Sequence, residues 1–111
     1  MVSASGVGAI VDADQVPVLP EVWLFTRQDV VPGGTRRNLG NLAGKVVWGP
    51  GVDDVDQLVL SDAQTSGGLL IAVPPDAALK LRDALISLGA PAAADVGTIV
   101  EGDRIVVRHG V

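Results

Sequence analysis

The chain has 111 residues, a formal net charge of -5, no cysteine and one histidine. This length suits a single domain, the acidic balance argues against a broad nucleic-acid surface, and the lack of cysteine excludes disulfides, thiolate metal sites and a cysteine nucleophile. The best apolar run, residues 67–73, is far shorter than the ~18 residues of a membrane span, and residues 1–8 do not resemble a secretory signal, so we expect a cytoplasmic protein and no membrane contact.

The first third of the chain predicts one strand and one short helix. Residues 1–6 are expected to be disordered or extended, ahead of a single domain at 7–111. Residues 7–11 are apolar and partly β-branched, which predicts a strand that runs into a polar turn at Asp12 and Asp14. Residues 21–27 predict a short helix that begins after Pro20 and ends before Pro32.

The middle of the chain predicts a loop, a helix and a buried strand. Residues 33–51 contain six glycines, so we expect mostly loop with a short helical turn. Residues 54–60 carry apolar side chains at helical spacing behind Asp53, a suitable N-cap. Residues 69–73 are continuously apolar, which predicts a central strand covered on both faces and the main contribution to the core.

The last third predicts a helix and a hairpin. Residues 77–88 form the strongest helical pattern, with Leu81, Ala84, Leu85 and Leu88 on one face and Gly89 at the end. Residues 96–100 and 104–108 alternate around a glycine turn at 101–103, which indicates a β-hairpin. The mixture of helices and strands without strict alternation predicts an α+β fold, with a mixed or antiparallel sheet packed against helices.

Two glycine-centred segments, residues 31–38 and 60–70, combine bare backbone with hydroxyl and amide side chains. Such segments let a phosphate or another anion approach main-chain N–H groups. Neither has P-loop or dinucleotide-binding spacing, and a tight turn remains the alternative for each. The candidate ligand-facing residues are Gly33, Gly34, Thr35, Arg37, Asn38, Gln64, Thr65, Ser66, Gly67 and Gly68. No catalytic residue and no metal ligand is assigned.

The remaining polar and aromatic candidates have plainer interpretations. Asp12 and Asp14 suit a strand-end turn better than a metal pair, and the acidic run at 53–56 suits helix capping better than a calcium loop. His109, two residues from the end, is expected to be a solvated tail residue. Trp23 and Phe25 are expected to divide between an inward and an interface position, and Trp48 to cover an apolar edge or anchor an interface.

Residues 62–70, Asp-Ala-Gln-Thr-Ser-Gly-Gly-Leu-Leu, resemble the Asp-Pro-Gln-Thr-Ser-Gly-Gly-Leu-Leu signature of selenophosphate synthetases, also called selenide, water dikinases. Residues 31–38 are similar to that family's Val-Pro-Gly-Gly-Thr-x-Arg-Asn segment. Ala63 departs from the usual proline, which loosens the turn without removing a polar group. The resemblance covers residues 7–111 and implies the α+β C-terminal domain shared with aminoimidazole ribonucleotide synthetase.

This resemblance also implies a function and its limits. Members of the family use ATP to phosphorylate selenide, giving selenophosphate, AMP and phosphate, with magnesium bound by aspartates. The family's ATP-binding half, with its catalytic cysteine or selenocysteine and its lysine, has no counterpart here, so we expect an N-terminally truncated domain that binds no cofactor and is inactive alone. ATP and Mg²⁺ are implied for the complete enzyme, in which the two glycine segments are expected to face one cleft.

The partners follow from the same reasoning. We expect an N-terminal ATP-binding domain or subunit of the same enzyme type, and a homo-oligomer. The alternative function is a non-catalytic interaction module, which pairs with a separate ATP-binding subunit or associates with itself.

Overall fold

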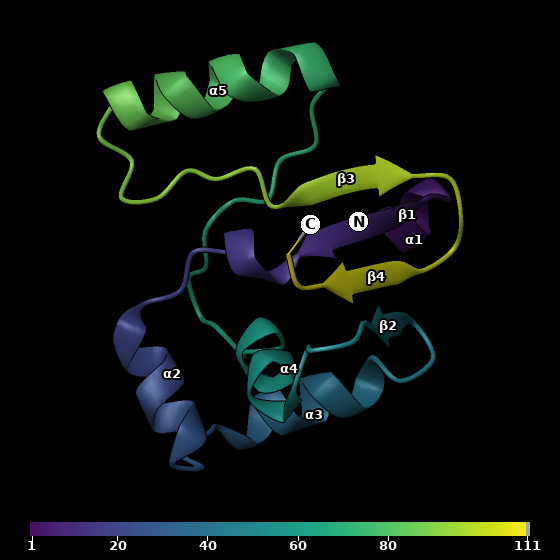
Figure 1. Cartoon of the computed structure of the whole chain (residues 1–111), viewed down its shortest axis with the longest axis vertical. Coiled ribbons are helices and arrows are strands. Elements are labelled where there is room, and N and C mark those ends of the chain that lie inside the picture. The colour runs from purple at the N-terminus through teal and green to yellow at the C-terminus, as the bar shows by residue number, and fades with distance from the viewer. Residues whose placement is uncertain (111) are drawn as a thin grey trace.

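The computed structural model describes residues 1–110, which form an α+β fold (Figure 1). The elements, in chain order, are α1 (Val2–Ser5), β1 (Gly8–Asp12), the 3-10 helix η1 (Ala13–Gln15), α2 (Pro20–Arg27), α3 (Gly33–Asn41), β2 (Val46–Trp48), α4 (Asp54–Leu60), α5 (Pro75–Ser87), β3 (Gly97–Val100) and β4 (Ile105–Arg108). The predicted fold class is confirmed. None of the helices in this part of the chain has the length and apolar character needed to cross a bilayer.

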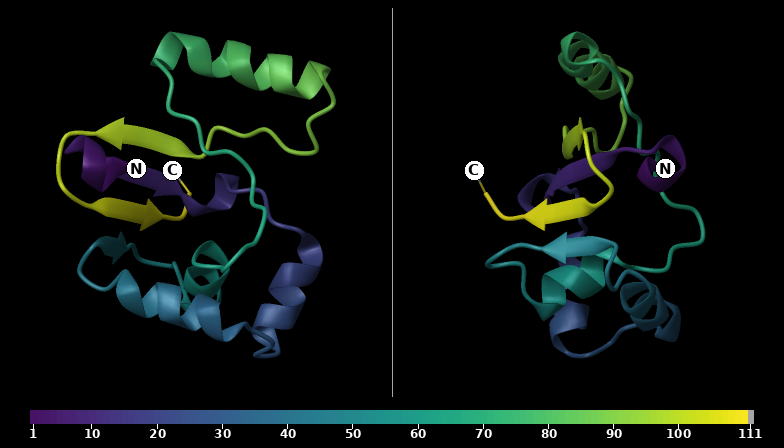
Figure 2. Two further views of the ribbon diagram at one scale, coloured as in Figure 1. Left: turned by 180° about the vertical axis from the view of Figure 1, so that it is seen from behind. Right: turned by 90° about the vertical axis from the view of Figure 1, so that its right-hand side faces the viewer.

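The sheet is mixed and has the strand order β2-β4-β1-β3. β1 pairs parallel with β4 and antiparallel with β3, and β2 pairs parallel with β4. Helices α2, α3 and α4 lie together on the β2 side, and α5 stands apart beyond β3 (Figures 1 and 2). In this strand order, β2 and β3 are the two edge strands of the sheet.

The predicted hairpin is wrong, although both of its strands exist. β1 lies between β3 and β4, so the two strands do not pair with each other. The inserted strand satisfies backbone groups on both sides: Ala9 N donates to Arg104 O at 3.1 Å, and Asp12 N donates to Val96 O at 2.8 Å. Gly8 and Ala9 are buried in this central position, which a two-stranded hairpin does not provide.

The hydrophobic core lies where β1 and β4 meet the loop ahead of α4. Its buried residues are Ala13, Val52 and Val107. Half-buried side chains pack around them: Val11, Val46, Trp48, Leu60 and Ile105. Trp48 thus covers an apolar edge of this chain, which was one of its two expected roles.

Residues 69–73 are neither a strand nor part of the core, contrary to the sequence prediction. They form an uncoiled connection that rises from α4 to α5 (Figure 1), in which the side chains of Leu69 and Leu70 are 90% and 68% exposed. Backbone groups of residues 64–73 make no hydrogen bond to any other part of residues 1–110. The positions on both sides of β1 and β4 are taken by other strands, so the central place predicted for residues 69–73 is filled.

Six of the predicted elements are confirmed within a residue or two: β1, α2, α4, α5, β3 and β4. In α4, Asp56 N donates to Asp53 Oδ1 at 2.9 Å and Asp53 N donates to Asp56 Oδ2 at 3.2 Å, so the expected acidic cap is a full capping box. α5 ends before Gly89, whose φ of 85° lies in the left-handed region. On the expected apolar face of α5, Leu81 and Leu85 are half-buried, whereas Ala84 and Leu88 are exposed.

Two further elements depart from the sequence prediction. Residues 1–6, expected to be disordered or extended, contain the single helical turn α1, which Gly6 closes in the left-handed conformation. Residues 33–41, expected to be mostly loop, form the nine-residue helix α3. Glycine disfavours a helix by about 1 kcal/mol at each interior position, so contacts with the rest of the fold must stabilise α3.

Candidate functional site

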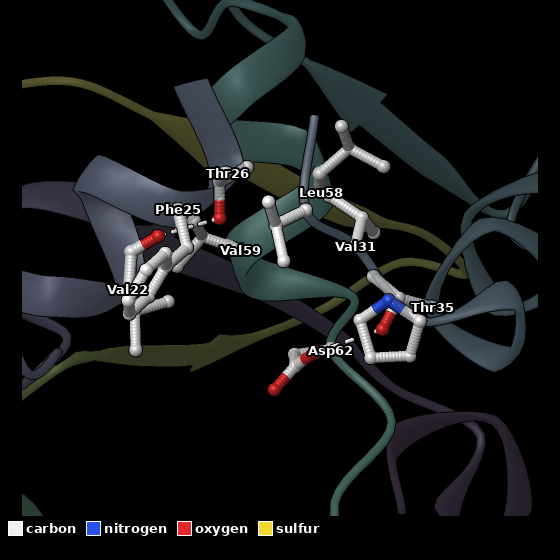
Figure 3. Close-up of a pocket in the computed structure, with 10 residues that line it drawn as sticks. Val22, Phe25, Thr26, Val31, Thr35, Leu58, Val59 and Asp62 are labelled. Carbon is white, nitrogen blue, oxygen red and sulfur yellow. Dashed lines mark hydrogen bonds between the residues drawn. The ribbon is translucent and has the colours of Figure 1, made fainter. Parts of the chain in front are cut away.

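Thr35 joins the two glycine-centred segments. It lies in the first turn of α3 and is only 1% exposed. Its hydroxyl donates to Asp62 Oδ1 at 2.7 Å and accepts from Ala63 N at 3.0 Å, so both hydrogen-bonding capacities are used (Figure 3). A buried side chain of the first segment therefore fixes the start of the second.

A second set of contacts strengthens this junction. Asn38, one turn along α3, donates its amide to Ser61 O at 3.0 Å, just after the end of α4. At Gly34 a Cβ atom would lie 3.1 Å from Ala63 Cβ, so the close approach of the two segments favours glycine there. These contacts explain why a glycine-rich sequence forms α3, because tertiary packing outweighs its poor helix propensity.

A pocket of about 330 Å³ lies beside the junction, between α2, the start of α3 and α4 (Figure 3). Three of its lining side chains are polar: Thr26, Thr35 and Asp62. The others are apolar: Val22, Phe25, Val30, Val31, Pro32, Leu58 and Val59. The hydroxyl of Thr26 is already used, because it donates to Val22 O at 2.6 Å. Among the lining residues, Asp62 is the one that carries a charge. A phosphate would be repelled there, and the pocket instead suits an apolar group.

The start of α3 has the better chemistry for an anion. Pro32 precedes the helix, and no side chain caps its first turn. The guanidinium of Arg37 lies close to this turn, since a Cβ at Gly33 would be 3.4 Å from Arg37 Nη1. Arg36 pairs with Asp29, whereas Arg37 has no ion-pair partner within residues 1–110. Backbone N–H groups, the helix dipole and Arg37 thus favour negative charge at Gly33 and Gly34.

The second half of the predicted site is not assembled with the first. Gln64, Thr65, Ser66, Gly67 and Gly68 are all exposed. Gln64 Nε2 lies 3.5 Å from Asp62 Oδ2, and its Oε1 would be 3.1 Å from a Cβ at Gly67. Gly68 has open space around it. The ligand-facing role of these five residues, and of those on α3, stays a prediction.

Two residues of the junction were missed by the sequence reasoning. Asp62 is the first residue of the signature string, but its carboxylate was not counted among the ligand-facing groups. Ser61 is buried, and its hydroxyl has no hydrogen-bond partner in the part of the chain that the structure describes. Only the position of Asp62, directly before a polar and glycine-rich run, offered a signal.

The magnesium that the family resemblance implies would need carboxylate ligands. Within residues 1–110 no three side chains of histidine, cysteine, aspartate or glutamate gather to hold a metal ion. Asp12 Oδ1 accepts from Arg108 Nε at 2.7 Å, and Asp14 accepts from His109 and from Gly110 N. His109 is exposed, in keeping with the expected solvated tail residue, but it is not free of contacts. Its ring contacts two carboxylates, those of Asp14 and Asp56.

Comparison with known proteins places the chain in a family and identifies relatives with names. Residues 1–110 match the family model described as AIR synthase related protein, C-terminal domain. A Myxococcus xanthus protein named selenide, water dikinase is 42% identical over 93 residues, which are 84% of this chain and 26% of that protein. A Pelobacter propionicus protein of the same name is 41% identical over 110 residues, which are 97% of this chain and 32% of that protein. The chain thus spans about a third or less of the length of these relatives.

Proposed function

Because the chain belongs to the family of AIR synthase related protein C-terminal domains, we propose that it serves as the C-terminal domain of a selenide, water dikinase. The names and identities of the two relatives support this assignment. The observation that carries it is the junction of Thr35 with Asp62 and Ala63, because it ties together the two segments on which the family resemblance rests. ATP use, selenium metabolism and a cytoplasmic location belong to this proposal.

The contribution of the chain to that enzyme is positioning. Phosphoryl transfer depends on metal ions and on donors arranged around the transferring group. Here the first turn of α3 supplies backbone N–H groups beside Arg37, and no described cluster supplies a metal cage. The N-terminal ATP-binding part of the same enzyme type is the partner that would supply the metal-binding aspartates and the reacting groups.

The test is a chimera. The matching segment of the Myxococcus xanthus protein is replaced by this chain, and AMP formation from ATP is measured with and without selenide. We expect selenide-dependent AMP formation by the chimera and none by the isolated chain. A folded chimera without this activity would refute the assignment, and so would AMP formation by the isolated chain.

A variant of the chimera tests the junction itself. Thr35→Val keeps the shape of the side chain but removes the hydroxyl that positions Asp62 and Ala63. Because small misplacements of catalytic loops are costly, we expect a loss of about tenfold or more in kcat/KM. Thr98→Val, on the exposed face of β3, is the matched control and should leave the rate unchanged. Equal rates for both variants would contradict a positioning role.

One observation favours a second candidate function, a non-catalytic interaction module. Residues 69–73 are apolar and exposed, and their backbone groups form no hydrogen bond within residues 1–110. An unpaired, extended and apolar segment is a typical site for strand addition by a partner. This surface would be used to bind a separate ATP-binding subunit or a second copy of the chain. A chain that binds such a subunit without supporting AMP formation would favour this function.

A further inference from the structure

Three segments that are far apart in the sequence converge on the imidazole of His109. The residue directly follows β4, its Nδ1 contacts Asp14 Oδ1 of η1, and its Nε2 lies 2.8 Å from Asp56 Oδ2 of α4. The adjoining Gly110 N donates to Asp14 Oδ2 at 2.5 Å. The histidine therefore bridges the end of the sheet to two other elements.

The geometry favours a protonated ring. A neutral imidazole has one N–H, so it can donate to one carboxylate only, and its other nitrogen would present a lone pair to an acceptor oxygen. The imidazolium ion donates at both nitrogens and satisfies both carboxylates. Hydrogen bonds to Asp56 and then Asp14 raise the pKa of His109 above its usual 6.5, against a smaller opposing effect of burial. The hydrogen bond between His109 and Asp14, followed by the one from Gly110 N, lowers the pKa of Asp14.

The surrounding charges favour the same state. Asp53 shares the capping box with Asp56 at the start of α4, and Asp95, ahead of β3, lines the same hollow as Asp14 and Gly110. The neighbouring cation, Arg108, is paired with Asp12 at 2.7 Å. The ring thus faces two carboxylates, contributed by η1 and α4, and Asp53 and Asp95 add negative charge nearby.

We propose that His109 is a pH-sensitive latch, which in its protonated form holds the C-terminal end of β4 against η1 and the start of α4. Loss of the proton removes the N–H group from one ring nitrogen. That nitrogen can then no longer donate to its carboxylate, and one of the two bridges weakens. Because the pKa is higher in the folded state than the ordinary 6.5, the stabilisation is complete below pH 6.5 and is lost as pH rises through the folded-state pKa. The latch acts on α4, the helix that leads into the junction at Asp62.

The experiment uses the fact that His109 is the single histidine of the chain. Proton NMR follows its ring C–H signals from pH 5 to 9 in the wild type and in Asp56→Asn, Asp14→Asn and Asp103→Asn variants. We expect a midpoint above 6.5 that falls towards 6.5 in the first two variants. Asp103, on the exposed loop at the other end of β4, is the control and should leave the midpoint unchanged. A wild-type midpoint at or below 6.5, or one that neither variant moves, would overturn the proposal.

Amide hydrogen exchange supplies a readout of the latch itself. In the wild type, exchange at Gly110 and in the first turn of α4 should accelerate as pH rises through the midpoint, beyond the intrinsic pH dependence of exchange. In His109→Gln the protection should be low throughout and independent of this midpoint. The Asp56→Asn variant can be compared directly with the wild type, because its amide oxygen can still accept from Asp53 N and so keep the capping box of α4. Protection that is identical in the wild type and His109→Gln would also refute the latch.

Discussion

Ser61 is a buried polar residue whose hydroxyl has no partner within residues 1–110, although its carbonyl accepts from Asn38. The residue is 5% exposed. Leaving a buried donor without an acceptor costs about 1–3 kcal/mol. The position therefore lowers the stability of the junction that it adjoins.

Replacement of Ser61 by alanine should stabilise the protein. The substitution removes the unsatisfied hydroxyl and leaves the carbonyl that Asn38 uses. We expect the free energy of unfolding to rise by about 1 kcal/mol, as measured by urea denaturation. Ser66→Ala, at an exposed position in the same segment, is the control and should change stability by less than about 0.5 kcal/mol. A loss of stability in Ser61→Ala would show that the hydroxyl is hydrogen-bonded in solution.

At the scale of elements, β3 lies close against the backbone of β1 at Gly97. A Cβ atom there would lie 2.1 Å from Ile10 O and 3.1 Å from Val11 Cα, both backbone atoms of the central strand. Backbone cannot move aside as a flexible side chain can. The antiparallel pairing of these strands therefore depends on glycine at this position.

Replacement of Gly97 by alanine should push β3 away from β1. We expect the free energy of unfolding to fall by about 1–3 kcal/mol, the usual range for overpacking. Gly40→Ala is the matched control, because it lies within α3 with nothing near its Cβ direction, and alanine should stabilise the helix by about 0.5–1 kcal/mol. Both variants are compared by urea denaturation. A Gly97→Ala variant as stable as the wild type would contradict the pairing of β1 with β3.

Local signals predicted the elements whose causes are local. The caps and spacing of α4 and the proline at the start of α2 lie within a few residues of the helices that they define. The failures have long-range causes. The hairpin is split by β1, which lies about 90 residues earlier, and the central sheet positions predicted for residues 69–73 are filled by β1 and β4. A single sequence does not reveal which of several apolar segments occupies a given sheet position.

The candidate site divides in the same way. The two motifs predicted that Thr35 and Asn38 belong to a functional region, and the structure brings both against the start of the second segment. Asp62 was missed because its partner, the hydroxyl of Thr35, lies 27 residues earlier in the chain. The contacts of His109 were not predicted, because its partners, Asp14 and Asp56, are 95 and 53 residues away, and no local pattern connects them.

At the scale of the whole molecule, the exposed apolar surface at residues 69–73 and on α5 needs an explanation. Leu69, Leu70 and Ile71 are exposed beside a backbone that forms no hydrogen bonds within the described chain, while α5 satisfies its own backbone. Residues 69–73 can associate through exposed apolar side chains and through backbone groups that are free to pair with another strand. Helix α5 offers only exposed apolar side chains. Association in solution should therefore depend on residues 69–73.

The double substitution of Leu69 and Leu70 by serine should abolish self-association without a change in net charge. Sedimentation velocity over rising concentration should show the wild type shifting to larger species and this variant remaining monomeric. The matched control is the double substitution of Leu79, on α5, and Leu88, its C-cap residue, by serine, since these leucines are similarly exposed; it should associate as the wild type does. Because Leu69 and Leu70 bury little surface, their loss should alter folding stability by less than about 0.5 kcal/mol. A wild type that stays monomeric at every concentration would show that this segment does not bind a second copy, and would leave a different subunit as its partner.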